Sequence, residues 1–318
     1  MIKGYIGSYA SKKSKHVIQF LFDEEKKQFI NRMQILPWED TKYMSLKGND
    51  LISVSKEQKA GILWLHKDNG SIEKLFLEQG TSCYVDQDED FIYTANYHEG
   101  TVMIYAKQNE FHLHKRILIQ EKAGCHQVIL QDHYLLVPCL LLDKVMVFDK
   151  DMDFAFVKDI TFPKGSGPRH GVFDHQGRFF IVSELSNQLF VFDVKDLNFT
   201  LCDTMDLLED TTRNAAAAAI RMSKDERFLY ISMRDVNQIV VVDVEKKTIR
   251  QRISSKGDHP RDIQLSSDDA FLFVANRFTD NVVVFERDAS QGTLTTCDTQ
   301  INAPEGVSIV LEPQEAEL

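Results

Sequence analysis

The chain has 318 residues, of which 43% are hydrophobic and 27% are charged, a balance typical of a globular protein with a sizeable core. Its formal net charge is −11 and its sequence pI is near 5.4. This charge argues against a general nucleic-acid or acidic-membrane binder, because no broad basic face is evident, but a local arginine cluster can still bind a small anion.

The cysteines and the first residues bear on cofactors and location. Five scattered cysteines include no C-x-x-C pair and no Cys/His cluster that would suggest zinc. The start, MIKGYIGSYA, lacks a basic-then-apolar signal region, and no apolar run is long enough to span a bilayer. We expect a cytoplasmic protein with reduced thiols, no metal and no other cofactor.

One strand pattern recurs along the chain: an apolar strand, a short polar loop, and a second strand that reads approximately V-x-V-F. These second strands begin, in chain order, with VIQF at Val17, ILWL at Ile62, VMIY at Val102, VMVF at Val145, LFVF at Leu189, IVVV at Ile239 and VVVF at Val282. The successive spacings are 45, 40, 43, 44, 50 and 43 residues. Seven repeats of this period, rich in β-branched and aromatic residues, predict a seven-bladed β-propeller with four-stranded antiparallel blades. The alanine run at 215–219 has helical propensity, but its place before SKDERFLYISM favours the start of a first strand.

The two ends of the chain predict how the ring closes. The N-terminal KGYIGSYA has a second-strand pattern without the strand that precedes it in the other repeats, and PEGVSIVLEP is an unpartnered first strand. We predict that residues 306–312 form the innermost strand of the blade made by residues 3–35, which removes exposed sheet edges. The expected architecture is all-β, a single seven-bladed propeller domain over residues 1–318.

Charged residues stand at the same end of several predicted blades. Antiparallel strands bring the start of the first strand and the end of the next to one face. In GPRHGVFDHQGRFFIVSEL, Arg169 and His170 begin a first strand, and Glu184 stands five residues before the LFVF strand. Other first-strand starts contribute His126, Arg261, Ser82 and Glu305, and the positions equivalent to Glu184 are Glu57, Tyr97, Leu140, Arg234 and Arg277.

These residue types suit the hydrolysis of an anionic ester. Arginine binds phosphate or carboxylate in bidentate fashion and stabilises an oxyanion, while histidine or glutamate activates water or protonates a leaving oxygen. A structural interpretation stays open: Glu184 can simply pair with Arg169, and His126 can be a buried structural histidine. Cys125 and His126 are neighbours whose side chains point to opposite faces of a strand, which argues against a Cys–His dyad.

At these motifs the sequence resembles the seven-bladed propeller lactonase family, whose bacterial members include 6-phosphogluconolactonase. The similar segments are GCHQVIL, LLVPCLLLDKVMVFD, GSGPRHGVFDHQGRFFIVSELSNQLFVFDV, SKDERFLYISMRDVNQIVVVDV and HPRDIQLSSDDAFLFVANRFTDNVVVFERD. The resemblance implies metal-independent hydrolysis of 6-phosphogluconolactone to 6-phosphogluconate in the pentose phosphate pathway. A fungal branch with the same fold catalyses reversible muconate lactonisation instead.

The resemblance also implies site residues. Motifs of the fungal branch match His126, Arg169 and Glu184, and a further arginine matches Arg234 or Arg261, while His170 follows from the PRH motif. Two departures point to another lactone if those positions act on the substrate. Ala219 stands where the family often has an acidic residue, and TSC, at 81–83, replaces P-T-H.

We therefore expect eight residues to form the site. The expected catalytic residues are His126, Arg169, His170 and Glu184, and the expected substrate-binding residues are Tyr97, Arg234, Arg261 and Arg277. Their partner is a small anionic lactone, and monomer and dimer both stay open. The alternatives are a lactonase or cycloisomerase for another carboxylated lactone, and a non-catalytic binding platform.

Overall fold

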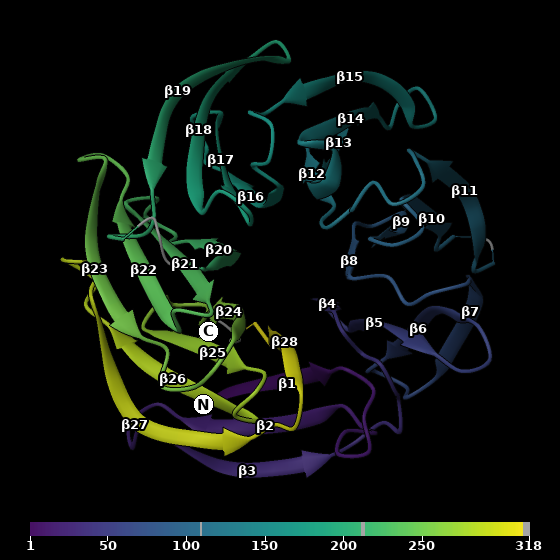
Figure 1. The fold of residues 1–318 in the computed structure, drawn as a ribbon. Helices are drawn as coiled ribbons and strands as arrows, with labels where there is room; N and C mark the ends of the chain where they lie inside the picture. The colour runs from purple at the N-terminus through teal and green to yellow at the C-terminus, as the bar shows by residue number, and fades with distance from the viewer. Residues whose placement is uncertain (109, 211–213, 314–318) are drawn as a thin grey trace. The chain divides into compact units, whose positions relative to one another are not determined.

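The computed structural model describes residues 1–108, 110–210 and 214–313. These residues form seven four-stranded antiparallel sheets, drawn in Figure 1, and one short 3-10 helix, Leu140–Leu142. The sheets confirm the all-β class and the number of blades. The chain divides into two compact units, Met1–Thr81 with Arg221–Leu318 and Ser82–Ile220, and the single-domain expectation for residues 1–318 stays a prediction.

Three blades lie within Ser82–Ile220, and their strands follow chain order across each sheet. The first contains β8 (Tyr84–Gln87), β9 (Phe91–Asn96), β10 (Thr101–Ala106) and β11 (His112–Leu118). The second contains β12 (Ile129–Gln131), β13 (Tyr134–Cys139), β14 (Lys144–Asp149) and β15 (Ala155–Thr161). The third contains β16 (Pro168–Phe173), β17 (Arg178–Ser183), β18 (Gln188–Lys195) and β19 (Asn198–Asp206).

Four further sheets contain the remaining strands. One contains β4 (Met44–Lys47), β5 (Asp50–Lys56), β6 (Ala60–His66) and β7 (Ile72–Glu78), and another contains β20 (Ala216–Met222), β21 (Phe228–Arg234), β22 (Gln238–Asp243) and β23 (Thr248–Ser254). A third contains β24 (Pro260–Leu265), β25 (Phe271–Asn276), β26 (Asn281–Arg287) and β27 (Leu294–Asn302). The terminal sheet has the order β28 (Gly306–Leu311), β1 (Ile2–Ser8), β2 (Ile18–Asp23) and β3 (Gln28–Gln34). Residues 216–219 of the alanine run lie in β20, so the preference for a strand is confirmed.

The V-x-V-F strands are third in their sheets, not second as the sequence pattern suggested. LFVF belongs to β18, between β17 and β19, and VVVF belongs to β26, between β25 and β27. The repeat pattern counted one strand too few before each V-x-V-F strand, and first strands as short as β8, with 4 residues, and β12, with 3, carry a weak pattern. Third strands read as continuous apolar runs because both of their faces are buried, as along β26. An edge strand such as β11 instead alternates between exposed and half-buried residues.

The predicted ring closure is confirmed by the pairing of the last strand with the first. β28 pairs antiparallel with β1, with Ile6 opposite Ile309, and both side chains are buried. Gly4 lies where β1 passes between Phe20 and Leu311. A Cβ there would lie 2.4 Å from the Phe20 ring, so only glycine fits this close approach.

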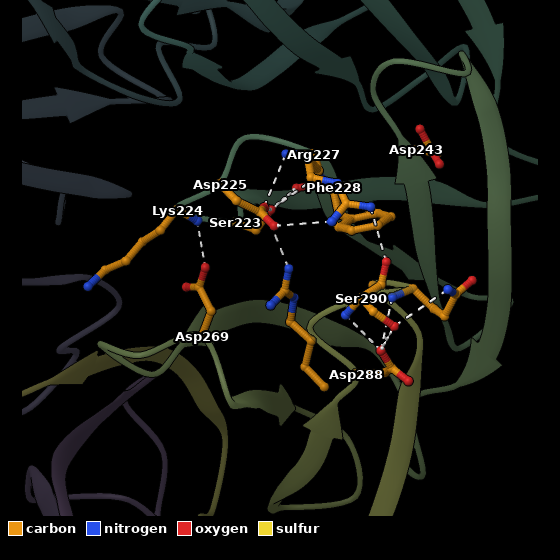
Figure 2. A network of polar contacts seen from close by, with 12 residues as sticks. Ser223, Lys224, Asp225, Arg227, Phe228, Asp243, Asp269, Asp288 and Ser290 are labelled. Atoms are coloured by element: carbon orange, nitrogen blue, oxygen red, sulfur yellow. Dashed lines mark hydrogen bonds and ion pairs between the residues drawn. The ribbon is translucent and has the colours of Figure 1, made fainter.

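A buried arginine organises the turn end of two sheets in the first unit. Arg287, at the end of β26, donates from Nε to the Tyr230 hydroxyl at 2.6 Å, and its Nη2 lies 3.6 Å from Asp225 Oδ1. Figure 2 shows the surrounding network, in which Asp225 accepts a hydrogen bond from Ser223 and Asp269 accepts one from the backbone of Lys224. Among the described residues, no helix is long and apolar enough to cross a membrane.

Candidate active site

Arg169 occupies a β-bulge at the start of β16. Pro168 pairs with Ser183 and His170 pairs with Val182, which leaves Arg169 as an extra residue without a partner across the ladder. Bulges re-aim side chains at strand ends. Glu184 directly follows β17, and Arg169 donates from Nε to Glu184 Oε2 at 2.8 Å. The structure thus brings these two predicted site residues together.

This ion pair is largely enclosed. The Arg169 side chain is 2% exposed and that of Glu184 is 20% exposed. A buried guanidinium is strongly unfavourable without a hydrogen-bonded carboxylate, so Glu184 stabilises the charged form of Arg169. The same contact restricts Glu184, because one of its oxygens already accepts a charge-assisted hydrogen bond.

The two predicted catalytic histidines contact one another. His126 Nδ1 lies 3.1 Å from His170 Nε2, and both residues are buried. His126 precedes β12, where its backbone N–H donates to the carbonyl of Pro138, and His170 lies in β16 of the next blade. One imidazole donates and the other accepts, so a proton gained by one ring is shared with the other.

Gln127 holds the histidine pair in register. Its Oε1 accepts the backbone N–H of Gly171 at 2.7 Å, and its Nε2 lies 3.3 Å from both the Tyr84 hydroxyl and the Gly171 carbonyl oxygen. These bonds connect the start of β12 to β16 and β8. The Tyr84 ring contacts His170 edge-on, with centroids 5.5 Å apart. Sequence reasoning missed Gln127 and Tyr84, whose only signal was their place beside first-strand starts.

Tyr97 also lies beside the pair. It follows β9, and its ring contacts His126 edge-on with centroids 6.0 Å apart. Cys83, rather than the expected Ser82, occupies the position equivalent to His126. The backbone N–H of Cys83 donates to the Ala95 carbonyl oxygen, just as that of His126 donates to Pro138. The offset arises because strand register, which the motif TSC does not reveal, decides which residue occupies that position.

The cysteine next to His126 is not arranged as a nucleophile. Cys125 and Cys139 face each other across an isolated bridge, with sulfurs 3.9 Å apart. Hydrogen bonding with Cys139 and burial raise the pKa of Cys125 well above its ordinary value, which keeps the thiol protonated. This geometry agrees with the sequence argument against a Cys–His dyad.

The remaining predicted residues lie in the first unit. Arg261 is the extra residue of a bulge in β24, because Pro260 pairs with Asn276 and Asp262 pairs with Ala275. Arg277 follows β25 and donates from Nε to Glu305 Oε2 at 2.8 Å. Arg234 is the buried last residue of β21. The convergence of all eight residues on one rim stays a prediction.

Two other positions of the predicted rim, and Ala219, which departs from the family pattern, take structural or exposed places. Leu140 is buried and begins the 3-10 helix, Ala219 is buried in β20, and Glu57 is exposed and pairs with Lys74 at 2.9 Å.

Among the described residues, one group could hold a metal ion: His133, Asp149 and Asp151, whose candidate ligand atoms lie within 4.8 Å of one another. His133 follows β12 and His126 precedes it, so this group lies outside the candidate site.

Comparison with known proteins identifies the family to which this chain belongs. The chain matches the family model described as "Lactonase, 7-bladed beta-propeller" over residues 3–311. It therefore belongs to the seven-bladed β-propeller lactonase family.

Individual relatives match nearly the whole length of this chain. An uncharacterised protein of Staphylococcus aureus is 32% identical over 349 residues, covering 98% of this chain and 100% of the relative. A candidate 6-phosphogluconolactonase from Bacteroides fragilis has a TM-score of 0.85 and 22% identity, with 98% of each chain covered. The periplasmic gluconolactonase of Pseudomonas aeruginosa has a TM-score of 0.85 and 21% identity, again with 98% of each chain covered.

Proposed function

We propose that this protein is a metal-independent lactonase that hydrolyses 6-phosphogluconolactone to 6-phosphogluconate, in the cytoplasm and in the pentose phosphate pathway. The observation that carries the proposal is the buried Arg169–Glu184 ion pair next to the His126–His170 hydrogen bond. Buried charges and paired imidazoles at strand ends are costly to maintain without a function. Membership of the lactonase family and the name of the Bacteroides relative support the reaction class.

The arginines supply binding and electrostatic stabilisation in this proposal. Arg169 and Arg261, with Arg234, hold the anionic group of the substrate and polarise the lactone carbonyl. As water adds to the carbonyl carbon, negative charge develops on the carbonyl oxygen and is stabilised by guanidinium N–H groups. Tyr97 and Arg277 complete the binding set.

The histidines and Glu184 move the protons. Glu184 or His126 removes a proton from the attacking water, the bond between the carbonyl carbon and the ring oxygen breaks, and His170 returns a proton to that oxygen. The contacts support His126 as the base, because Glu184 already accepts a hydrogen bond from Arg169. The hydrogen bond to His170 then spreads the positive charge that His126 acquires.

The test is the initial rate on freshly prepared 6-phosphogluconolactone, measured against spontaneous opening. We expect His126→Ala and Arg169→Ala each to lower kcat/KM by about 10²–10⁴, the range for losing an acid–base or oxyanion-stabilising group. The matched control is His175→Ala, at an exposed turn of the blade that contains Arg169. A wild-type rate equal to spontaneous opening would overturn the proposal.

A second candidate is a lactonase for an unphosphorylated or carboxylated lactone. The replacement of P-T-H by TSC, with Cys83 at the position equivalent to His126, favours it, as does the likeness to a gluconolactonase. A higher kcat/KM for glucono-δ-lactone than for its 6-phosphate would select this candidate. Conversion of a muconate lactone without net hydrolysis would identify a cycloisomerase. A Glu184→Gln variant that keeps the biological activity of the wild type would identify a binding platform.

A further inference from the structure

Three cationic side chains surround one aromatic ring in the first unit. The Arg277 guanidinium carbon lies 4.2 Å from the centroid of the Tyr9 ring, that of Arg261 lies at 5.4 Å, and Lys42 Nζ lies at 5.5 Å. Cations within about 6 Å of an aromatic face are attracted by its quadrupole. Three of them repel one another, so their gathering is favoured by negative charge placed among them.

The four residues are brought together from distant parts of the chain. Tyr9 follows β1, at the position that Glu184 has in its own blade, and its backbone N–H donates to the Glu305 carbonyl oxygen at 3.1 Å. Arg261 comes from the bulge of β24, Arg277 follows β25, and Lys42 precedes β4. Strand ends of three different sheets therefore contribute to this cluster, hereafter the Tyr9 cluster.

The carboxylates next to the Tyr9 cluster do not balance its charge. Arg277 pairs with Glu305 at 2.8 Å and Lys42 pairs with Asp40 at 3.4 Å. Arg261 makes no ion pair with any residue that the structure describes, and its guanidinium lies over the Tyr9 ring. The cluster has three positive charges and two paired negative ones. The half-buried guanidinium of Arg261 is therefore the group of the cluster best placed to bind an anion.

Tyr9 orients these cations through its ring. The guanidinium groups of Arg261 and Arg277 lie over the ring. The Nε of Arg277 is directed to Glu305, whereas the fork of Arg261 suits bidentate contact with an oxyanion. Glu305 has a φ of 53° in the turn before β28, where the Gly306 N–H donates to the Ala303 carbonyl oxygen. The ion pairs of Arg277 and Lys42 and the contacts with the Tyr9 ring position the three cations.

We infer that Tyr9 is the positioning residue of an anion-binding site whose ligating groups are Arg261, Arg277 and Lys42. The ligand is a phosphate or carboxylate group. Resting on the proposed function, we identify it as the anionic group of the lactone, and Arg261 is the residue that this site shares with the arginine set of that proposal. The ring of Tyr9 does this positioning and its hydroxyl does not, because the three cations are arranged about the ring.

Calorimetric titration of the intact protein tests the inference directly. The probes are 6-phosphogluconate, gluconate and inorganic phosphate. We expect Tyr9→Leu and Arg261→Met each to raise the Kd of the bound probe about tenfold or more, the effect of losing one charge-assisted contact. Tyr9→Phe restores wild-type affinity. Arg250→Met, which removes an exposed arginine on β23, is the charge-matched control and leaves the Kd unchanged.

The arms of the titration separate the two anions and the two hypotheses. If inorganic phosphate and 6-phosphogluconate each bind, the site recognises phosphate. If gluconate and 6-phosphogluconate each bind, the site recognises a carboxylate. If Tyr9→Leu weakens probe binding while the wild type hydrolyses no lactone, the anion site stands and the proposed function fails. If the lactone is hydrolysed and Tyr9→Leu changes neither Kd nor KM, the inference fails alone. A Tyr9→Phe variant as weak as Tyr9→Leu also overturns it.

Discussion

His126 and His170 stand 44 residues apart in the chain, yet their ring nitrogens lie 3.1 Å apart. Each comes from the first-strand end of its own blade, and Gln127 holds the two ends together through Gly171. The pair shares a single proton in its hydrogen bond. An imidazole whose partner can take up positive charge is a better acceptor for the proton of an attacking water.

The first prediction is that this pair acts as one unit. His126→Ala and His170→Ala should each lower kcat/KM by about 10²–10⁴, and the double variant should be no slower than the slower single variant. Each variant alone already removes the shared proton. Initial rates of the four proteins of the double-mutant cycle measure the coupling. Fully additive losses would show that the histidines act independently.

The second prediction concerns the Arg169–Glu184 pair. Glu184→Gln should lower the free energy of unfolding by about 1–3 kcal/mol, because the buried Arg169 loses its counter-charge. Glu57→Gln is the matched control, because Glu57 follows the second strand of another blade but forms an exposed ion pair with Lys74. It should change stability by less than about 0.5 kcal/mol. Denaturant titration measures both, and equal effects would contradict the role of burial.

The third prediction contrasts two carboxylates of the network in Figure 2. Burial raises the pKa of Asp269 above 3.8, and the Lys224 backbone hydrogen bond and the charge of Arg287 only partly offset it. Burial also acts on Asp225, but hydrogen bonds from Ser223 and the backbone of Arg227, with the charge of Arg287, outweigh it and lower the pKa of Asp225 below 3.8.

These shifts have opposite consequences for stability. The contribution of Asp225 is present above pH 3.8 and is lost as pH falls through its lowered pKa, so Asp225→Asn should destabilise the protein at pH 7. The contribution of Asp269 is present below pH 3.8 and is lost as pH rises through its raised pKa, so Asp269→Asn should stabilise at pH 7. The effect of Asp225→Asn should be below about 1 kcal/mol, because Asp225 is partly exposed. The effects of both variants should vanish in strong acid. The measurement is unfolding across this pH range. If both substitutions change the free energy of unfolding at pH 7 in the same direction, the predicted contrast is wrong.

The fourth prediction is a ranking of thiol reactivity. Cys202 is exposed, whereas Cys125 and Cys139 are buried. Burial raises the pKa of Cys297 to about 11, and the Cys139 contact and burial raise that of Cys125. At pH 8 a disulfide reagent should therefore modify Cys202 fastest, and the buried thiols only after unfolding. Cys202→Ser should abolish the fast phase, and persistence of that phase would disprove the ranking.

The fifth prediction tests closure by β28. A chain ending at residue 304 lacks Val307 and Ile309, both buried, and leaves β1 with an unpaired edge. Burial of an aliphatic side chain stabilises by about 1.5–3 kcal/mol, so the loss should exceed about 3 kcal/mol and promote aggregation. A chain ending at residue 313 keeps all β28 pairs and serves as the control. Equal thermal unfolding midpoints would contradict the stabilising role of β28.

Much of the fold could be predicted from local patterns. Third strands such as that beginning at Val282 are apolar on both faces, so their spacing revealed the number of blades. The strand at 306–311 is also an apolar run, and because it has no partner strand after it in the sequence, it indicated pairing with the N-terminal strand. The position of the V-x-V-F strands within each sheet was not predictable from the repeat, which placed them second instead of third; first strands of three or four residues, such as β12 and β8, carry too few positions for a clear pattern.

The candidate site was predictable in composition but not in arrangement. Arg169 and His126 were identifiable because charged residues at first-strand starts stand out from apolar surroundings. The bulges that give Arg169 and Arg261 their directions depend on pairing register, as does the offset between Ser82 and Cys83. None of these can be read from residue type.

The amino-acid sequence by itself determined the strand content, the repeat and the terminal closure, because alternation and apolar runs reflect burial within a few residues. Only the tertiary structure decided which side chains meet: His126 with His170, and Tyr9 with Arg261 and Arg277. Such contacts join residues tens to hundreds of positions apart. Their geometry follows from sheet register and bulges, which arise from pairing in three dimensions rather than from local propensity.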